Sequence, residues 1–338
     1  MALLDNALTR RLNTPYPFWQ APLPFDLVPA EFAGQISAAG ALGMLRVAPF
    51  DTCHALQTRI ERYRTHHANP AICFYHTLPQ QAQMMPVPAW ESEAFFASLD
   101  IYPPPELPAP DSFENLLGTA IAAAPRAIGF AHGLPERDYI SALREQGIFT
   151  FAVCTDLAEA VAAEIFGVDA LVLQGPEAGG ERAGFANDLA SPPQPALSLL
   201  QQVRRDINLP LIVWGDFSDS ADIVAAILCG AQSVMLDRPW LTCAEAALDE
   251  GQYRLLRETS EFANRATTCY SAHPLRHFRV SSAQTHSEAA SREALWHHYF
   301  AQKPEARPLC AAASPTPQAA DLNTLLQHYQ QGIRQFLA

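Results

Sequence analysis

The sequence of 338 residues contains a single lysine, Lys303, and no GxxxxGK[ST] run. We therefore expect neither lysine Schiff-base chemistry nor a Walker-type phosphate loop. The chain also lacks a CxxC pair, because its seven cysteines are widely spaced. This spacing disfavours a disulfide framework and a structural zinc site, and it fits a reducing compartment. No HExxH pattern occurs, and the sequence predicts no metal site.

Basic residues are scarce relative to acidic ones, with 22 against 35 and a net charge of −13. This balance argues against a nucleic-acid or anionic-membrane partner, since both require basic patches. No uninterrupted apolar run reaches the length of a membrane span, and residues 1–11 carry Asp5 rather than an apolar stretch. We expect no signal peptide, no membrane span and a cytoplasmic protein.

Eight short apolar segments alternate with stretches of helical spacing. The segments lie near residues 18, 45, 73, 129, 151, 172, 212 and 235. Continuous apolar strands between amphipathic helices indicate a parallel sheet covered by helices. Eight such units over about 240 residues fit a (β/α)8 barrel better than an open sheet. The fold prediction is thus an α/β protein of the TIM-barrel class.

The predicted domain organisation places the barrel in residues 1–245 and a helical region in residues 246–338. That region has helical spacing over 248–265, 288–301 and 321–336. Residues 78–110 hold a dense share of the 28 prolines. This segment is either a lid over the substrate or a packed surface excursion, since long loops in compact domains are often functional.

Active sites of barrels lie on the loops that follow the strands. The loop after the sixth segment is rich in glycine, with four of the chain's 16 glycines in residues 175–184. Glycine lets the backbone approach a flat or charged ligand closely. An ordinary flexible surface loop is the alternative interpretation.

Two further loops follow the seventh and eighth segments, between which barrels often bind a phosphate. Gly215 opens a turn before a helix, and Arg238 is placed to meet a phosphate. The alternative for Arg238 is an ordinary ion pair with Asp237 or Asp216. His132, after the fourth segment, is a candidate for the substrate pocket, although a lone histidine is more often a structural hydrogen bonder.

At these loops the sequence resembles the nitronate monooxygenase (2-nitropropane dioxygenase) family of FMN-dependent barrels. The most specific match is the string QGPEAGG at residues 174–180. The resemblance extends along most of the chain, through residues 16–22 (YPFWQAP), 38–44 (AAGALGM), 129–135 (GFAHGLP), 167–180, 230–234 (GAQSV) and 240–245 (WLTCAE).

The resemblance implies a barrel that holds FMN non-covalently over its mouth and oxidises an alkyl nitronate with O2. Small-molecule substrate and O2 would be the partners, and a homo-oligomer is left open. The residues that match the family's cofactor positions are Gln174, Gly179 and Gly180 at the flavin, Ala21, Pro22 and Leu23 under its ring, and Gly215, Asp216, Met235, Leu236, Asp237 and Arg238 in the phosphate loops.

The sequence also departs from the family pattern. A histidine associated with catalysis in the family is replaced by Glu181, which is the candidate catalytic base. A carboxylate serves as a base when its pKa is raised, whereas the neighbouring Arg182 would lower it. The family's glycine after strand seven becomes Asp216, and its Gly-Thr after strand eight becomes Asp237-Arg238. The asparagine that commonly ends strand three in the family is also missing.

The acidic replacements predict weak FMN binding. Two unit charges 4 Å apart interact by ~4 kcal/mol at an effective dielectric constant near 20. If Asp216 and Asp237 point inward and Arg238 offsets one of them, FMN affinity falls by roughly 10³-fold. Two alternatives therefore accompany the oxidoreductase hypothesis. One is a cofactor-poor or non-catalytic barrel, and the other is a flavin-dependent enoyl-thioester reductase, which the missing histidine also weakens.

Overall fold

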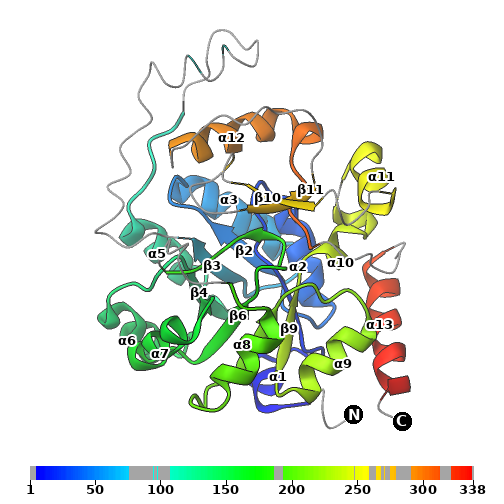
Figure 1. Cartoon of the computed structure of the whole chain (residues 1–338). Coiled ribbons are helices and arrows are strands. Elements are labelled where there is room, and N and C mark those ends of the chain that lie inside the picture. The colour runs from blue at the N-terminus through cyan, green and yellow to red at the C-terminus, as the bar shows by residue number, and fades with distance from the viewer. Residues whose placement is uncertain are drawn as a thin grey trace.

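The computed structural model describes residues 5–75, 94, 97, 107–185, 193–246, 248–258, 264–267, 270, 275–278, 291–312 and 321–336. Most of the proline-rich segment predicted at 78–110 lies outside the described residues. The described fold consists of the barrel strands, their helices and part of the C-terminal region (Figure 1).

The centre of the fold is a sheet of eight parallel strands. These are β1 (Phe18–Gln20), β2 (Met44–Val47), β3 (Ala71–Tyr75), β4 (Ala127–Ala131), β5 (Phe149–Cys154), β6 (Ala170–Gln174), β8 (Leu211–Trp214) and β9 (Ser233–Leu236). Their order is β1-β9-β8-β6-β5-β4-β3-β2. A parallel bridge between Trp19 and Leu42, just before β2, brings the two edges together. The sheet is thus a nearly closed barrel, and the (β/α)8 prediction is confirmed.

The strands read as continuous apolar runs because both of their faces are buried. Phe151 and Trp214 are fully buried. At Gly129 on β4 a Cβ would lie 2.0 Å from the Phe151 ring, so glycine there makes room for the aromatic side chain.

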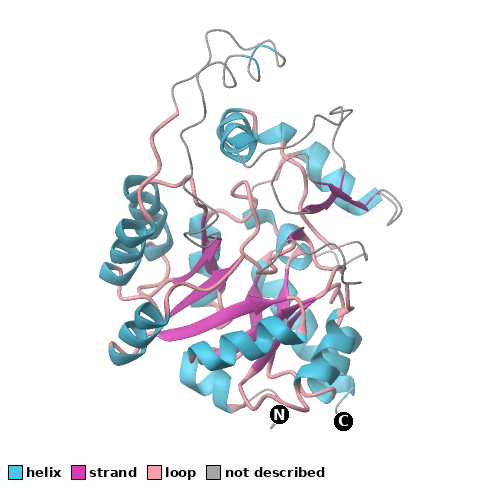
Figure 2. Ribbon diagram, turned by 60° about the vertical axis from the view of Figure 1, so that its left-hand side comes forward, coloured by secondary structure: helices cyan, strands magenta, loops and turns pink. Residues whose placement is uncertain are grey.

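Helices cover the outside of the barrel, as Figure 2 shows. Their bounds are α1 (Ala7–Leu12), α2 (Ala30–Ala38), α3 (Cys53–Arg64), α5 (Phe113–Ala122), α6 (Arg137–Glu145), α7 (Leu157–Phe166), α8 (Ala196–Val203), α9 (Ser220–Leu228), α10 (Arg238–Leu241), α11 (Glu250–Glu258), α12 (Ser291–Gln302) and α13 (Leu322–Phe336), with 3-10 turns η1 (Ala244–Ala246) and η3 (Pro304–Ala306). Among the described residues no helix is long and apolar enough to cross a membrane.

The C-terminal region contains a small sheet that the sequence did not predict. Strands β10 (Asn264–Thr267) and β11 (Leu275–Phe278) join the short β7 (Gly180–Glu181) in the order β10-β11-β7. The helix predicted over 248–265 is therefore wrong in its last part, because α11 ends at Glu258. Pairing with β7 binds this region to the glycine-rich loop, a long-range contact that local sequence does not encode.

The start of α9 gives a test of local stability. The Asp219 side chain accepts hydrogen bonds from the backbone N–H groups of Ala221 and Asp222. In turn, the Asp222 side chain accepts a hydrogen bond from the backbone N–H of Asp219. Such caps are worth about 1 kcal/mol. We expect D219A to lower the free energy of unfolding by about that amount, measured by urea denaturation. No loss would show that α9 is held by its packing alone.

Candidate functional site

The glycine-rich loop is folded back onto the end of β6 by one side chain. Gln174 Nε2 donates to the Glu181 carbonyl at 2.8 Å, and Gln174 Oε1 accepts from the Ala183 N–H at 2.7 Å. Gly180 has a φ of +85°, a conformation that strongly favours glycine. Residues 178–181 are buried. The loop is thus an ordered part of the barrel mouth rather than an exposed surface loop.

The loop after β1 lies beside the glycine-rich loop, as predicted. The Ala21 N–H donates to the carbonyl of Leu236 on β9, and the Leu23 N–H donates to the Ala21 carbonyl. Leu23 Cδ2 lies 3.3 Å from the position that a Cβ on Gly180 would occupy. Ala21, Pro22 and Leu23 are all buried. The structure therefore brings the residues predicted for the flavin ring to one side of the mouth.

A buried arginine lies at the centre of the mouth. Arg46 Nη2 on β2 is 2.5 Å from Glu181 Oε2 and 3.1 Å from Glu293 Oε1 on α12. Its guanidinium carbon lies 4.5 Å from the ring centroid of Tyr75, at the end of β3. The side chains of Arg46, Glu181 and Glu293 are 7%, 2% and 10% exposed. We call these three residues the Arg46 cluster.

Arg46 is held in its ionised form. Burial by itself would lower the pKa of Arg46, but the charges of Glu181 and Glu293 outweigh it and raise that pKa above its usual value. Burial raises the pKa of the Tyr75 hydroxyl well above its usual value, so this ring is neutral. The cation that pairs with Glu181 is Arg46, whereas Arg182 directs Nη2 to the Thr155 carbonyl at 3.5 Å.

Sequence reasoning did not single out Arg46 or Glu293. Arg46 is a charged residue within an apolar strand, and that departure from the strand pattern is the signal by which it could have been found. Glu293 lies far along the chain on α12, and nothing in its local sequence indicates that it reaches the barrel.

Asp237, the first residue after β9, is buried, and each of its two carboxylate oxygens accepts two hydrogen bonds. Its Oδ2 accepts from the Gly179 N–H at 2.8 Å and from the Trp214 indole N–H at 3.1 Å. Its Oδ1 accepts from the N–H groups of Arg238 at 2.5 Å and Ala312 at 2.8 Å. Burial raises the pKa of the Asp237 carboxyl, and these donors oppose the rise.

The other residues predicted at the phosphate loops point elsewhere. Arg238 donates to the carbonyls of Leu256 and Ala312, and its guanidinium carbon lies 4.9 Å from the Phe278 ring centroid. Half-buried Asp216 accepts a hydrogen bond from the Ser218 hydroxyl at 3.1 Å. The guanidinium of Arg238 thus contacts main-chain carbonyls and an aromatic ring, and its role at a phosphate stays a prediction. Gly215, Met235 and Leu236 are buried.

His132 lies at the same mouth, in the left-handed backbone region with a φ of +64°. Its N–H donates to the Ala183 carbonyl at 3.0 Å, and its ring centroid is 5.2 Å from that of Tyr75. It is 5% exposed. The structure thus places the predicted pocket histidine next to the ring that stacks on Arg46.

The two sides of the mouth differ in how well they fit FMN. On the ring side the predicted residues lie together and the glycine conformation is in place. On the phosphate side the N–H groups of Gly179 and Ala312 already have an acceptor in Asp237. A Cβ on Gly179 would lie 2.4 Å from Ala311 Cα, so the described C-terminal segment 309–312 lies directly against that glycine. As arranged, this side does not fit a phosphate.

Helix α12 covers the mouth, and a histidine on it makes this cover sensitive to pH. The Phe25 N–H donates to His297 Nε2 at 3.2 Å, which requires a neutral ring, and burial lowers the pKa of His297 below 6.5. Below about pH 6.5 the folded state then binds fewer protons than the unfolded state, so stability falls as the pH drops below that value and is constant above it.

We expect the free energy of unfolding to lose up to about 1.4 kcal/mol per pH unit just below that pH through His297. Chemical denaturation at pH 7.5 and 5.5 measures it. H297Q removes this part of the pH dependence, while the exposed His54, replaced in H54Q, serves as the control. Equal pH dependence in H297Q and the unaltered protein would contradict the assignment.

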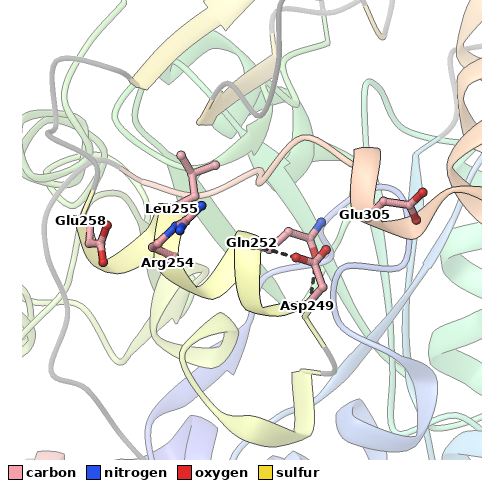
Figure 3. Close-up of a pocket in the computed structure, with 7 residues that line it drawn as sticks. Asp249, Gln252, Arg254, Leu255, Glu258 and Glu305 are labelled. Carbon is pink, nitrogen blue, oxygen red and sulfur yellow. Dashed lines mark hydrogen bonds between the residues drawn. The ribbon is translucent and has the colours of Figure 1, made fainter.

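A cavity of about 440 Å3 lies on the outer surface beside α11 and η3 (Figure 3). Two of its polar lining residues are already paired, since Asp249 and Gln252 each accept a hydrogen bond from the other's backbone N–H and Gln252 Nε2 donates to the Pro304 carbonyl. None of its lining residues belongs to the barrel mouth. We therefore take the mouth, not this cavity, as the candidate active site.

Comparison with known proteins supports this choice. The model of the family described as nitronate monooxygenase matches residues 5–325. A nitronate monooxygenase from Paraburkholderia phytofirmans is 33% identical over 270 residues, which cover 77% of this chain and 72% of that protein. A probable nitronate monooxygenase from Staphylococcus saprophyticus is 26% identical over 283 residues, which cover 81% of this chain and 78% of that protein.

Solved structures share the fold. A nitroalkane oxidase from Streptomyces ansochromogenes has a TM-score of 0.78 and 23% identity, over 98% of this chain and 99% of that one. FabK from Thermotoga maritima has a TM-score of 0.69 and 16% identity, over 98% of this chain and 97% of that one. At these identities the likeness shows the barrel architecture alone.

Proposed function

Since this chain belongs to the nitronate monooxygenase family, whose members are FMN-type flavoprotein oxidoreductases, we propose that it oxidises small alkyl nitronates with O2. The observation that carries the proposal is the buried guanidinium of Arg46 at the barrel mouth. A nitronate is a planar anion whose charge is shared by two oxygens. An arginine fork matches such a group as it matches a carboxylate.

The residues of the mouth would bind and orient the anion. Glu293 and Glu181 place carboxylate oxygens against Arg46, and these oxygens mark positions that nitronate oxygens can take. Because Glu293 comes from the covering helix α12, its displacement would admit the substrate. Glu181 would stay and hold the guanidinium in orientation. It stands where the family has its histidine, but its ion pair with Arg46 works against the role of base that the sequence suggests for it.

Tyr75 and His132 complete the substrate side. The neutral Tyr75 ring fixes one face of the guanidinium, and His132 lies against the same ring. A flavin, when bound, supplies the electron transfer to O2, while the protein supplies orientation and charge. FMN is the flavin that the family implies, and only the ring side of the mouth fits it.

The test is oxygen consumption with the nitronate of 2-nitropropane, with FMN and riboflavin added in separate assays. R46K keeps the charge but loses the planar fork, so we expect KM to rise at least about tenfold. R59K is the matched control, because Arg59, which lies on α3, pairs with Asp51 at 2.6 Å and does not belong to the Arg46 cluster. Absence of turnover with both flavins would overturn the proposal.

The cofactor-poor alternative is favoured by one observation, the acceptor role of Asp237 on the phosphate side. It expects no turnover and no flavin binding. The assay therefore decides between the two functions. Among the residues that the structure describes, none in the mouth specifically favours an enoyl-thioester reductase.

A further inference from the structure

The carboxylate of Asp237 is surrounded by hydrogen-bond donors from separate parts of the fold. Gly179 belongs to the loop after β6, Trp214 ends β8, and Ala312 belongs to the C-terminal segment. The fourth donor is the N–H of Arg238, which follows Asp237 in the chain. Buried donors that converge on one carboxylate form an anion site, and this chain fills that site with its own side chain.

The location of Asp237 is the one where a barrel holds a ligand's phosphate. Asp237 directly follows the last strand of the barrel sheet, and Trp214 ends the strand beside it. Phosphates in this fold often bind between the loops after strands seven and eight. Asp237 also replaces the glycine of the family's Gly-Thr pair, so a carboxylate has been introduced where the family leaves space.

The site has no room for a second anion. Each Asp237 oxygen already accepts two N–H donors, and a phosphate beside it would face a like charge at close range. Arg238 is held by the carbonyls of Leu256 and Ala312. Gly179 is covered by Ala311, so a phosphate would also have to displace the chain there.

We infer that Asp237 takes the place of the flavin phosphate and that this chain selects a flavin without a phosphate over FMN. The inference rests on the flavin-dependent function proposed above and specifies its cofactor. Riboflavin carries the same isoalloxazine ring and an uncharged tail, so the residues on the ring side can act on it equally.

The test titrates the protein, freed of flavin, with riboflavin and with FMN and follows the flavin fluorescence. We expect riboflavin to bind at least about tenfold more tightly than FMN, because only FMN brings a charge to Asp237. Equal affinities, or tighter binding of FMN, would overturn the inference.

Two variants distinguish whether FMN is excluded because Asp237 occupies the N–H donors or because nearby carboxylates repel its phosphate. D237G opens the position and frees the donors, so we expect FMN affinity to rise at least about tenfold and FMN to raise the Tm of D237G more than riboflavin does. D216N is the matched control, because it removes a nearby charge without freeing these donors, and we expect its preference for riboflavin to persist. If D237G does not fold, the titration of the unaltered protein decides alone.

The outcomes distinguish this inference from the proposed function. Tight binding of FMN with nitronate turnover would overturn the inference and keep the function. Riboflavin binding without nitronate turnover would do the reverse. Failure of both flavins to bind would overturn both.

Discussion

R46M is expected to lower the free energy of unfolding by about 3–5 kcal/mol, because removing one member of a buried ion-pair network leaves uncompensated buried charge. Glu181 and Glu293 would remain in the mouth without the cation that both contact. Urea denaturation at neutral pH measures the loss. The stability difference between R46M and the unaltered protein should shrink as the pH is lowered, because each unpaired carboxylate of R46M is then neutralised by a proton.

The matched control for R46M is R10M. Arg10 pairs with Asp5 at 2.8 Å, but the two side chains are 63% and 69% exposed. Exposed pairs contribute at most about 1 kcal/mol, so R10M should change little. Combining R46M with E181Q and E293Q should recover most of the lost stability, because it removes the unpaired charges. A loss below about 1 kcal/mol for R46M would contradict the description of the cluster as a buried ion pair.

D237A is expected to lower the free energy of unfolding by about 3 kcal/mol or more, since each buried donor left without a partner costs about 1–3 kcal/mol. The N–H groups of Gly179 and Ala312 and the indole N–H of Trp214 would all lose their acceptor. The measurement is again urea denaturation. The loss should clearly exceed that of D219A, which removes an exposed helix cap.

Two further results check the prediction for Asp237. D237N keeps one acceptor oxygen and should fall between D237A and the unaltered protein. Added FMN should restore part of the lost stability of D237A, since an anion that binds only the folded state stabilises it. A D237A protein as stable as the unaltered one would show that water or a local shift satisfies these donors.

The barrel could be predicted from the sequence because each strand and helix is indicated by the pattern of residues within its own segment. The strand beginning at Ala170 and its neighbours are apolar on both faces, and a glycine such as Gly167 ends the helix before β6. The alternation of apolar strand and helix, which gives eight strands, leaves few alternatives to a closed parallel sheet. The strands β10 and β11 escaped prediction because they are short and depend on pairing with β7.

The site was predicted in part. The string at residues 174–180 pointed to the loop after β6. In the structure Gln174 hydrogen-bonds to this loop, and Gly180 adopts a positive φ within it. The partners of Glu181 and Asp237 could not be predicted, because Arg46, Glu293 and Ala312 are distant in the chain. Sequence alone also leaves open whether an acidic residue repels a ligand or occupies its place, which only the direction of the side chain decides.

The most direct test of this account is a crystal structure of the protein grown with an excess of FMN. The account predicts that Asp237 keeps its hydrogen bonds to the N–H groups of Gly179 and Ala312, with no phosphate between the loops that follow β8 and β9. A phosphate bound to those N–H groups, with the Asp237 side chain turned away, would contradict it.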